Sequence, residues 1–268
     1  MTDIILNPIG IVHSEVKDPR AMPFMGAPAT IEVFSAYADG LRHLEKHSHL
    51  WVITWLSLAA RDQLLVAPRG LRDETEAGRH GVFAVRLAPR PNPVGLSVAK
   101  IEAVEGNRVH VDRIDFIDET PVIDMKPYIR RFEAIAVARN EPIRHPVNRE
   151  AALRALLLDA ENFHGERCGG LALAARIVEH ARSTLFDHRH PPGLEVVAPR
   201  QRGCLIDNLI ALLGTSFGRG TLHLHDDDVV ILRHGQQQYA YALRAPLTPG
   251  VETIVAAPET ELFYFSQL

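Results

Sequence analysis

The pattern of apolar and polar positions changes character near residue 140. In the first half, short apolar runs are separated by prolines and glycines, which is typical of a small all-β barrel or sandwich. Residues 97–104 and 109–116 alternate on either side of Glu105-Gly106-Asn107, which predicts a β-hairpin. Further strands are expected over 31–34, 50–56 and 81–86, and one helix over 40–47. The run 50–56 is apolar almost throughout, which predicts a strand buried on both faces.

The second half mixes helix and strand signals. Helices are expected over 151–162, 171–185 and 205–213, with Asn148 as an N-cap, and strands over 194–197, 221–224, 229–232 and 239–243. Asp226-Asp227-Asp228 is expected at a hairpin tip, and the apolar residues 262–265 should pack onto the body or onto a second subunit. The pattern therefore predicts a mixed fold class: an all-β small barrel or sandwich over 1–140 and an α+β domain over 141–268.

A proline-rich segment, residues 86–97, joins the predicted strands of the first half. Pro89, Pro91 and Pro93 each fix φ and lack a backbone donor, so they cannot lie in a central strand. The segment is expected to be a stiff, extended loop that ends at Gly95. Arg86 and Arg90 add fixed positive charge to it.

Composition limits the classes of partner and compartment. The net charge is −4, so any nucleic-acid binding must come from a local patch. The arginines at 61, 69, 72, 79, 86 and 90 could form such a patch, or simply a solvated face. Only two cysteines, Cys168 and Cys204, argue against a disulfide scaffold and favour the cytoplasm. No apolar run approaches the roughly 20 residues of a membrane helix, so no membrane contact is expected.

Three aspartates, Asp115, Asp118 and Asp124, follow or flank the predicted strand ends near Lys126. Such carboxylates could hold a ribose diol or a metal, or could accept a proton as catalytic bases. Alternatively, they cap turns and pair with Lys126. Phe24 and Met25, apolar in a loop, could pack locally or contact an adenine or a thioether.

Six motifs in order carry a resemblance: I-G-x-V-x-S, M-P, S-H-L-W-V, G-V-F-A-x-R, R-P-N-P-x-G-L-S and D-x-x-D-x-T-P-V-x-D-x-K-P-Y. Together they resemble the TsaA-like family, also called YaeB or TrmO, over roughly residues 5–130. The resemblance implies a small β-barrel that binds S-adenosylmethionine and N6-methylates threonylcarbamoyladenosine beside the tRNA anticodon. The cofactor-binding positions that it implies here are Pro23, Phe24, Met25, Ser57, Leu58, Arg86, Leu96, Asp115, Phe116, Ile117 and Asp118. Glu119 stands where the family usually has glycine in D-G-T-P.

The second half contains a possible metal site. His164 and Cys168 are four residues apart at a glycine-rich helix start, and Cys204 is a third candidate ligand, for example for zinc. The alternative is a buried thiol beside a loop histidine. Residues 150–245 resemble the FmdE family, in which the opening is usually F-H-G-H-x-C, with Glu166 here in place of the second histidine.

The function expected from these features is S-adenosylmethionine-dependent methylation of tRNA. The alternatives are a small-molecule methyltransferase and a protein that senses S-adenosylmethionine or a metal. A homodimer is expected, because small barrels with apolar loops often need a partner surface.

Overall fold

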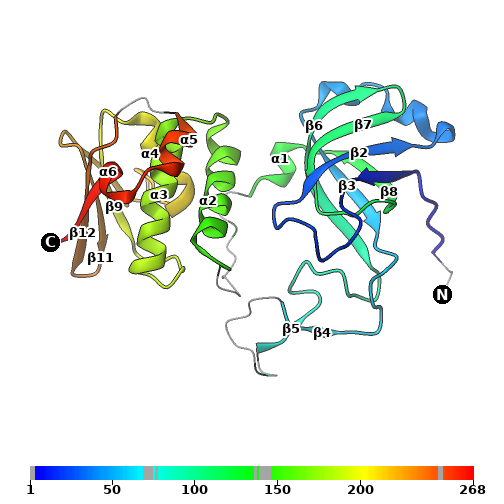
Figure 1. Ribbon diagram of the computed structural model, residues 1–268, viewed down its shortest axis with the longest axis horizontal. Helices are drawn as coiled ribbons and strands as arrows, with labels where there is room; N and C mark the ends of the chain where they lie inside the picture. The colour runs from blue at the N-terminus through cyan, green and yellow to red at the C-terminus, as the bar shows by residue number, and fades with distance from the viewer. Residues whose placement is uncertain (1–3, 69–74, 76–77, 136–137, 139–145, 247–249) are drawn as a thin grey trace. The chain divides into compact units, whose positions relative to one another are not determined.

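The chain divides into two compact units, Met1–Asn140 and Glu141–Leu268 (Figure 1). Each unit has its own apolar core. The computed structural model describes residues 4–68, 75, 78–135, 138, 146–246 and 250–268. Among the helices in these ranges, none is long and apolar enough to cross a membrane.

The first unit is a closed six-stranded barrel, which confirms the fold that the family resemblance implied and decides between the barrel and the sandwich that the pattern left open. Its strands are β1 (Gly10–Ser14), β2 (Ala27–Val33), β3 (His49–Trp55), β6 (Val94–Glu105), β7 (Arg108–Ile114) and β8 (Pro121–Pro127). They close in the order β1-β2-β7-β6-β3-β8. The core is filled from alternate strand positions, among them Ile31, Leu50 and Val109, because successive side chains of a strand point to opposite faces.

The β6–β7 hairpin confirms its prediction, whereas β3 differs from its prediction. Glu105 pairs with Arg108 across a two-residue turn in which Gly106 has φ 61°, a conformation that favours glycine. Strand β3 is not buried on both faces. Leu50 and Val52 are fully buried, while the tryptophans at 51 and 55 are only half-buried, because one face of a barrel strand faces outward.

The described residues between β3 and β6 are mostly irregular. Strands β4 (Leu65–Val66) and β5 (His80–Gly81) form a short two-stranded sheet, and of the strand predicted over 81–86 only Gly81 is in a strand. Val82 is buried but Phe83 is 84% exposed, so the apolar run does not line a core. The three prolines lie outside the strands, as predicted.

Gly95 does not end the proline loop but lies inside β6. An added Cβ would come within 2.6 Å of the Phe116 ring and would also collide with the Thr54 hydroxyl. Glycine is therefore required here by the close approach of the barrel core.

Short turns replace the helix predicted over 40–47. Two 3₁₀ helices, η1 (Ser35–Leu41) and η2 (Leu44–Lys46), are separated at His43, whose φ of 70° breaks any continuous helix. One further turn of helix, α1 (Arg130–Glu133), follows β8.

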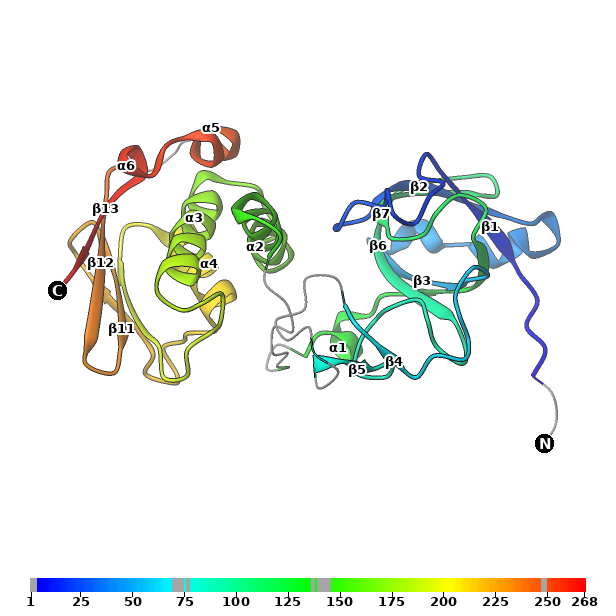
Figure 2. The same cartoon turned by 60° about the horizontal axis from the view of Figure 1, so that its bottom comes forward.

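The second unit is a two-layer α+β domain. Helices α2 (Arg149–His164), α3 (Gly169–Thr184) and α4 (Gly203–Leu213) correspond to the three predicted helices. Figures 1 and 2 show them on one face of a five-stranded sheet. The sheet order is β10-β9-β11-β12-β13, and its strands are β9 (Glu195–Pro199), β10 (Leu222–His225), β11 (Val229–His234), β12 (Gln237–Leu243) and β13 (Phe263–Gln267). Two short helices, α5 (Val251–Ala256) and α6 (Glu259–Leu262), precede β13.

Individual predictions for this unit had different outcomes. The Asn148 side chain accepts a hydrogen bond from the Ala151 amide, which confirms the N-cap. The apolar end of the chain forms β13 against β12, which confirms that it packs onto the body. Asp226–Asp228 is not a hairpin tip, because β9 lies between β10 and β11. Instead, Asp228 forms an ion pair with Arg202 at 2.5 Å, beyond the end of β9.

Candidate functional site

The loops that carry the predicted cofactor residues all leave the barrel at one end. The register pairs Ala27 of β2 with Ile114 of β7, and Trp55 of β3 with Val94 of β6. At the start of β8, Val122 is opposite Thr54 of β3, and Pro121 is opposite Ile11 of β1. The ends of β1, β3 and β7 therefore lie beside the starts of β2, β6 and β8. We call this the loop end of the barrel.

A tight turn places Phe24 and Met25 at the loop end. The Gly26 amide donates to the Pro23 carbonyl oxygen at 2.9 Å, so Phe24 and Met25 occupy the two central positions of the turn. Gly26 has φ 81°, and a Cβ there would lie 2.7 Å from the Ile114 carbonyl oxygen. The turn is thus in close contact with the end of β7, directly before Asp115.

The loop after β7 is fastened to the loop after β1 through Asp118. The Asp118 carboxylate accepts a hydrogen bond from the Ser14 amide at 3.0 Å, and its own amide donates to Val16 at 2.8 Å. The next residue, Glu119, has φ 61°, the left-handed conformation for which the family uses glycine. Ser14 was not among the predicted site residues, because a backbone donor leaves no signal in the sequence.

The three candidate aspartates have different surroundings. The Asp118 carboxylate accepts the hydrogen bond from the Ser14 amide, and Asp124 forms a 2.6 Å ion pair with Lys126. Asp115 is exposed, and among the described residues its carboxylate has no hydrogen-bond or ion-pair partner. The alternative that these acids cap turns and pair with Lys126 therefore holds for two of the three. Asp115 alone is available to a ligand.

Hydrogen bonds to backbone carbonyls hold the proline loop in shape. The Arg90 guanidinium donates to Val82, Val85 and Leu87, and Arg61 donates to Pro91 at 3.1 Å. Arg61 also lies over the Trp55 ring, 5.5 Å from its centroid. These two arginines are used within the protein, which leaves less of their charge for a partner.

Arg86 connects the start of the proline loop to β6. Its Nη2 donates to the carbonyl oxygen of Leu96. The ladder between β6 and β7 runs only from Ile101 to Glu105, so the first part of β6 is not paired with β7. Arg86 supplies a donor to this part of the strand.

Apolar side chains surround these polar groups at the loop end. Phe24 is 66% exposed, Leu58 79% and Leu96 42%, whereas Phe116 is buried in the barrel core. Exposed apolar side chains next to an uncommitted carboxylate are suited to an adenosine, whose base is flat and whose ribose carries hydroxyl donors. The residues present thus fit the chemistry of S-adenosylmethionine, with Asp115 towards the hydroxyl or ammonium groups.

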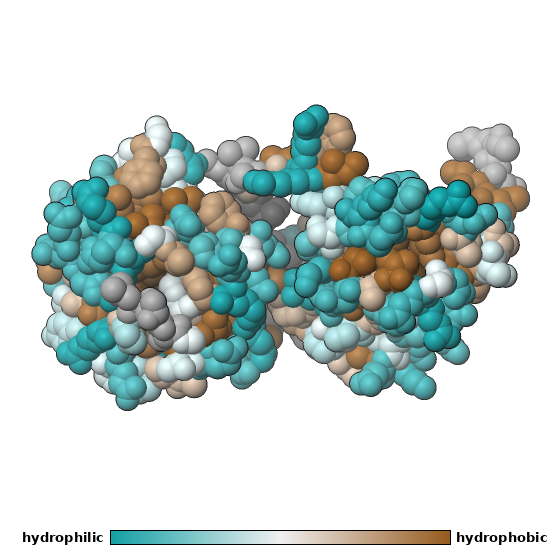
Figure 3. Space-filling view, turned by 90° about the horizontal axis from the view of Figure 1, so that it is seen from above, coloured by the Kyte–Doolittle hydropathy of each residue, from teal (hydrophilic) through white to brown (hydrophobic). Residues whose placement is uncertain are grey.

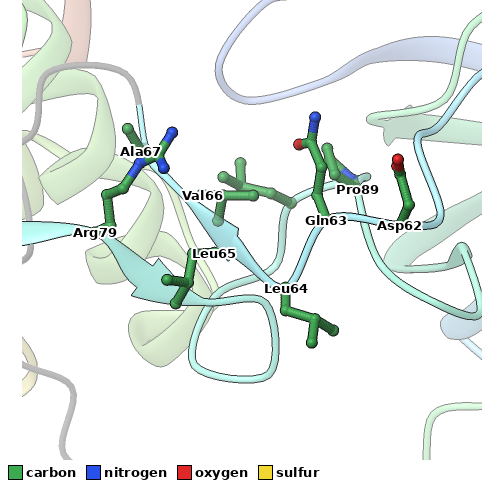
Figure 4. Close-up of a pocket in the computed structure, with 9 residues that line it drawn as sticks. Asp62, Gln63, Leu64, Leu65, Val66, Ala67, Arg79 and Pro89 are labelled. Carbon is green, nitrogen blue, oxygen red and sulfur yellow. The ribbon is translucent and has the colours of Figure 1, made fainter. Parts of the chain in front are cut away.

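An open cavity of about 610 Å³ lies on the β4–β5 side of the proline loop (Figure 4). It is lined by Asp62, Gln63, Leu64, Leu65, Val66, Ala67, Arg79, Leu87 and Pro89, none of which is a predicted cofactor residue. Of the predicted arginine run, Arg69 and Arg72 lie outside the described residues. Apolar surface also interrupts the polar surface of both units on the face in Figure 3.

Helix ends bring the three predicted metal ligands together in the second unit. His164 ends α2, Cys168 is the N-cap of α3, and Cys204 lies in the first turn of α4. One ligand atom from each lies within 4.8 Å of the others, and Cys168 Sγ is 3.5 Å from His164 Nε2. Tetrahedral zinc, with bonds of about 2.0–2.3 Å, needs ligand atoms roughly 3.5–3.8 Å apart. Gly170 permits this approach, since a Cβ there would lie 2.7 Å from Cys204 Cβ.

Acidic groups surround the two thiols. The pKa of Cys204 is raised by loss of hydration first, and then by Cys168, Asp207 and Glu166. Asp207 also lies 3.6 Å from His164 Nδ1, the position from which a carboxylate orients a metal-binding imidazole. The donor set therefore fits a thiophilic divalent cation. Asp207 was missed from the sequence, although its place three residues after Cys204 on a helix puts both on one face.

The fold and these candidate sites define a two-domain protein: a small barrel with a candidate site at its loop end, followed by an α+β domain with a thiol–imidazole cluster. Residues 11–134 match the family described as "tRNA-methyltransferase O N-terminal domain". Residues 163–263 match the family described as "FmdE, Molybdenum formylmethanofuran dehydrogenase operon".

Three relatives illustrate the similarity. An "S-adenosyl-L-methionine-binding protein" of Archaeoglobus fulgidus is 43% identical over 136 residues, which cover 49% of this chain and 94% of the relative. A "Probable S-adenosyl-L-methionine-binding protein" of the same organism is 32% identical over 225 residues, which cover 81% of this chain and 60% of the relative. The "tRNA (adenine(37)-N6)-methyltransferase" of Mus musculus is 34% identical over 102 residues, 38% of this chain and 23% of that enzyme. The chain belongs to the TrmO family through its N-terminal barrel.

Proposed function

We propose that the barrel, residues 1–140, binds S-adenosylmethionine at its loop end and that the protein is an S-adenosylmethionine-dependent methyltransferase. The observation that carries this proposal is the meeting of three loops, β1–β2, β3–β6 and β7–β8, at one end of the barrel, where the carboxylate of Asp115 is uncommitted. Two Archaeoglobus fulgidus relatives named for S-adenosyl-L-methionine binding support it. The second unit, residues 141–268, is proposed to be an accessory FmdE-like domain.

Each part of the loop end has a role in this proposal. When bound, S-adenosylmethionine supplies an electrophilic methyl group on a sulfonium, so no metal is needed for the transfer. The apolar side chains of Phe24, Leu58 and Leu96 would exclude water and contact the adenine. Asp115 would accept a hydrogen bond from the cofactor or a proton from the methyl acceptor, since its carboxylate has no other described partner. Asp118 would maintain the shape of the loop.

We further propose that the methyl acceptor is N6-threonylcarbamoyladenosine beside the tRNA anticodon. The resemblance of the motifs to TrmO and the similarity to the mouse tRNA (adenine(37)-N6)-methyltransferase support this substrate. The amide-like nitrogen of this nucleoside is a weak nucleophile, so a carboxylate that takes its proton would help the reaction. A small-molecule acceptor and a purely sensory function are the alternatives.

Two experiments test these proposals in sequence. Calorimetric titration of the full chain with S-adenosylmethionine should show saturable binding, and the absence of binding would contradict both proposals. Bulk tRNA from cells that lack the N6-methyl group should then receive radiolabelled methyl from S-adenosylmethionine. If the cofactor binds but tRNA is not methylated, the barrel is a cofactor-binding module or acts on another acceptor.

For the second unit, we propose that His164, Cys168 and Cys204 bind a zinc ion. Three protein ligands leave a fourth coordination position for a water molecule or for Glu166. The charge of Glu166 acts on the Cys204 thiol and raises its pKa. A homodimer and a cytoplasmic location are also proposed. Light scattering on the purified chain would test the dimer, and cell fractionation would test the compartment.

A further inference from the structure

A cavity in the second unit contains charged groups that do not pair with each other. It has a volume of about 170 Å³ and lies between α2, α3 and the segment that follows α3. It is lined by Pro146, Ala152, Ala155, Leu156, Asp159, Glu179, Arg182 and His188. None of these residues belongs to the proposed cofactor or metal sites.

Arg182 provides an available cation in the cavity wall. Its Nη2 donates to the Leu212 carbonyl oxygen at 2.8 Å, which holds the guanidinium in place. Its Nε is buried with no hydrogen-bond partner, and its Nη1 has none among the described residues. A buried donor without a partner costs roughly 1–3 kcal/mol of folding stability, so the stability of the fold does not by itself explain this arginine.

Asp159 provides an available anion at the mouth of the cavity. Its side chain keeps contact with solvent, and among the described residues the carboxylate has no hydrogen-bond or ion-pair partner. Asp159 and Arg182 form no ion pair within the described residues, an ion pair being a nitrogen and an oxygen within 4.0 Å of each other. Partial burial raises the pKa of Asp159, although Arg182 opposes this effect. The two charges thus face a common space without neutralising each other directly.

The remaining groups define the size and net charge of a suitable ligand. Glu179 is already neutralised by Arg149, whose Nη2 lies 2.6 Å from it. Of the carboxylates and guanidinium groups in the wall, one anion and one cation are left, so a ligand of zero net charge with both signs matches these two groups. The other wall residues, such as Ala152, Ala155 and Leu156, are apolar. At about 30 Å³ per water molecule, the volume corresponds to roughly six waters, which is too small for a nucleoside.

From this arrangement we propose that the cavity binds a small neutral α-amino acid as its zwitterion. The ligand carboxylate contacts Arg182 inside the cavity, the ammonium group contacts Asp159 at its mouth, and a short side chain lies against the alanines. Two consecutive residues of the adjoining segment, Asp187 and His188, have φ of 47° and 56°. Strained backbone of this kind concentrates at binding sites.

To test the proposal, the full chain is titrated with L-alanine. Binding is measured by calorimetry, and stability by the melting temperature. L-Alanine should bind saturably and raise the melting temperature, whereas propionate, without the ammonium group, and ethylamine, without the carboxylate, should bind at least about tenfold more weakly. Glycine, L-serine and L-valine complete the panel. If none of the four amino acids binds at millimolar concentration, the proposal is overturned.

Variants separate this site from the rest of the protein. Asp159→Asn should weaken alanine binding by about tenfold or more, while Glu150→Gln, on the exposed face of the same helix, should bind like the wild type. Arg182→Lys keeps the charge but loses the planar donor pair, and should also weaken binding. Both site variants should keep the wild-type affinity for S-adenosylmethionine, so failure here is distinct from failure of the barrel site. Alanine binding that is unchanged in Asp159→Asn and in Arg182→Lys would contradict the proposal.

Discussion

Arg86 donates a hydrogen bond from Nη2 to the carbonyl oxygen of Leu96, ten residues further along the chain. The bond spans the whole proline loop and joins its two ends. The prolines limit the conformations of the loop, and Arg86 fixes where it starts relative to β6. Because Leu96 is partly exposed at the loop end of the barrel, this bond sets the position of a predicted cofactor contact.

Removing the Arg86 side chain should weaken S-adenosylmethionine binding. Arg86→Ala leaves the Leu96 carbonyl without this donor and frees the loop, so the cofactor must order the loop when it binds. A charge-assisted hydrogen bond of about 1.5–3 kcal/mol sets the largest loss of affinity at roughly ten- to hundredfold. Calorimetry measures the change. Arg108→Ala is the matched control, since Arg108 is an exposed arginine at the opposite end of β7. Equal affinity of Arg86→Ala and wild type would remove Arg86 from the site.

Substitutions at Glu119 should change stability according to their cost at positive φ. Glu119 adopts a left-handed conformation, which costs a residue other than glycine about 1–2 kcal/mol. Glycine removes this strain, but part of the gain is lost because glycine also gives the unfolded chain more conformational freedom. Glu119→Gly should therefore be neutral or stabilising by up to about 1 kcal/mol, while the β-branched Glu119→Val should destabilise by about 1–2 kcal/mol. Urea denaturation monitored by tryptophan fluorescence gives both values. A Val variant as stable as the Gly variant would show that the backbone conformation is different.

Zinc content should depend on both cysteines. Purified without a histidine tag, the wild type should contain about one zinc per chain, and Cys168→Ser and Cys204→Ser should each lose most of it. Elemental analysis by mass spectrometry measures this, with His223→Gln on the sheet as the control. Wild-type protein without stoichiometric metal would rule out the site, and Cys168 would then serve only as the N-cap of α3, with Cys204 beside it.

His180 should make the second unit less stable in acid. Burial lowers the pKa of His180, which lies against Tyr241 and two phenylalanines, although Glu259 opposes the shift. The folded state therefore favours the neutral ring, whose contribution is complete above the ordinary pKa of about 6.5 and is lost as the pH falls below it.

The comparison of wild type with His180→Gln isolates this effect. From about pH 7.5 to about pH 5, the wild type should lose more free energy of unfolding than the variant, since the glutamine does not titrate. Chemical denaturation across this range gives the difference. His223→Gln, an exposed histidine of the same unit, should follow the wild type. Parallel curves for wild type and His180→Gln would show that His180 takes up its proton without penalty.

Local signals were enough for much of the architecture. The hairpin around Gly106, the Asn148 N-cap and the three main helices of the second unit depend on neighbours in sequence, and each formed as predicted. The local pattern gave wrong predictions where the structure depends on which distant segments pair with each other. Residues 81–86 alternate like a strand, but within the described chain none of them after Gly81 has a partner strand. Asp226–Asp228 connects strands that are not adjacent.

The sequence by itself determined the barrel, the mixed second domain, and the residue types at the loop end and the metal cluster. Only the tertiary structure decided which of those residues are free to act. In the folded protein Asp118 accepts a hydrogen bond from the Ser14 amide and Asp124 pairs with Lys126, which leaves Asp115 available. The physical reason is that a carboxylate is committed by the donors that the fold brings to it, and those donors, a backbone amide among them, come from distant segments whose approach is not encoded in local pattern.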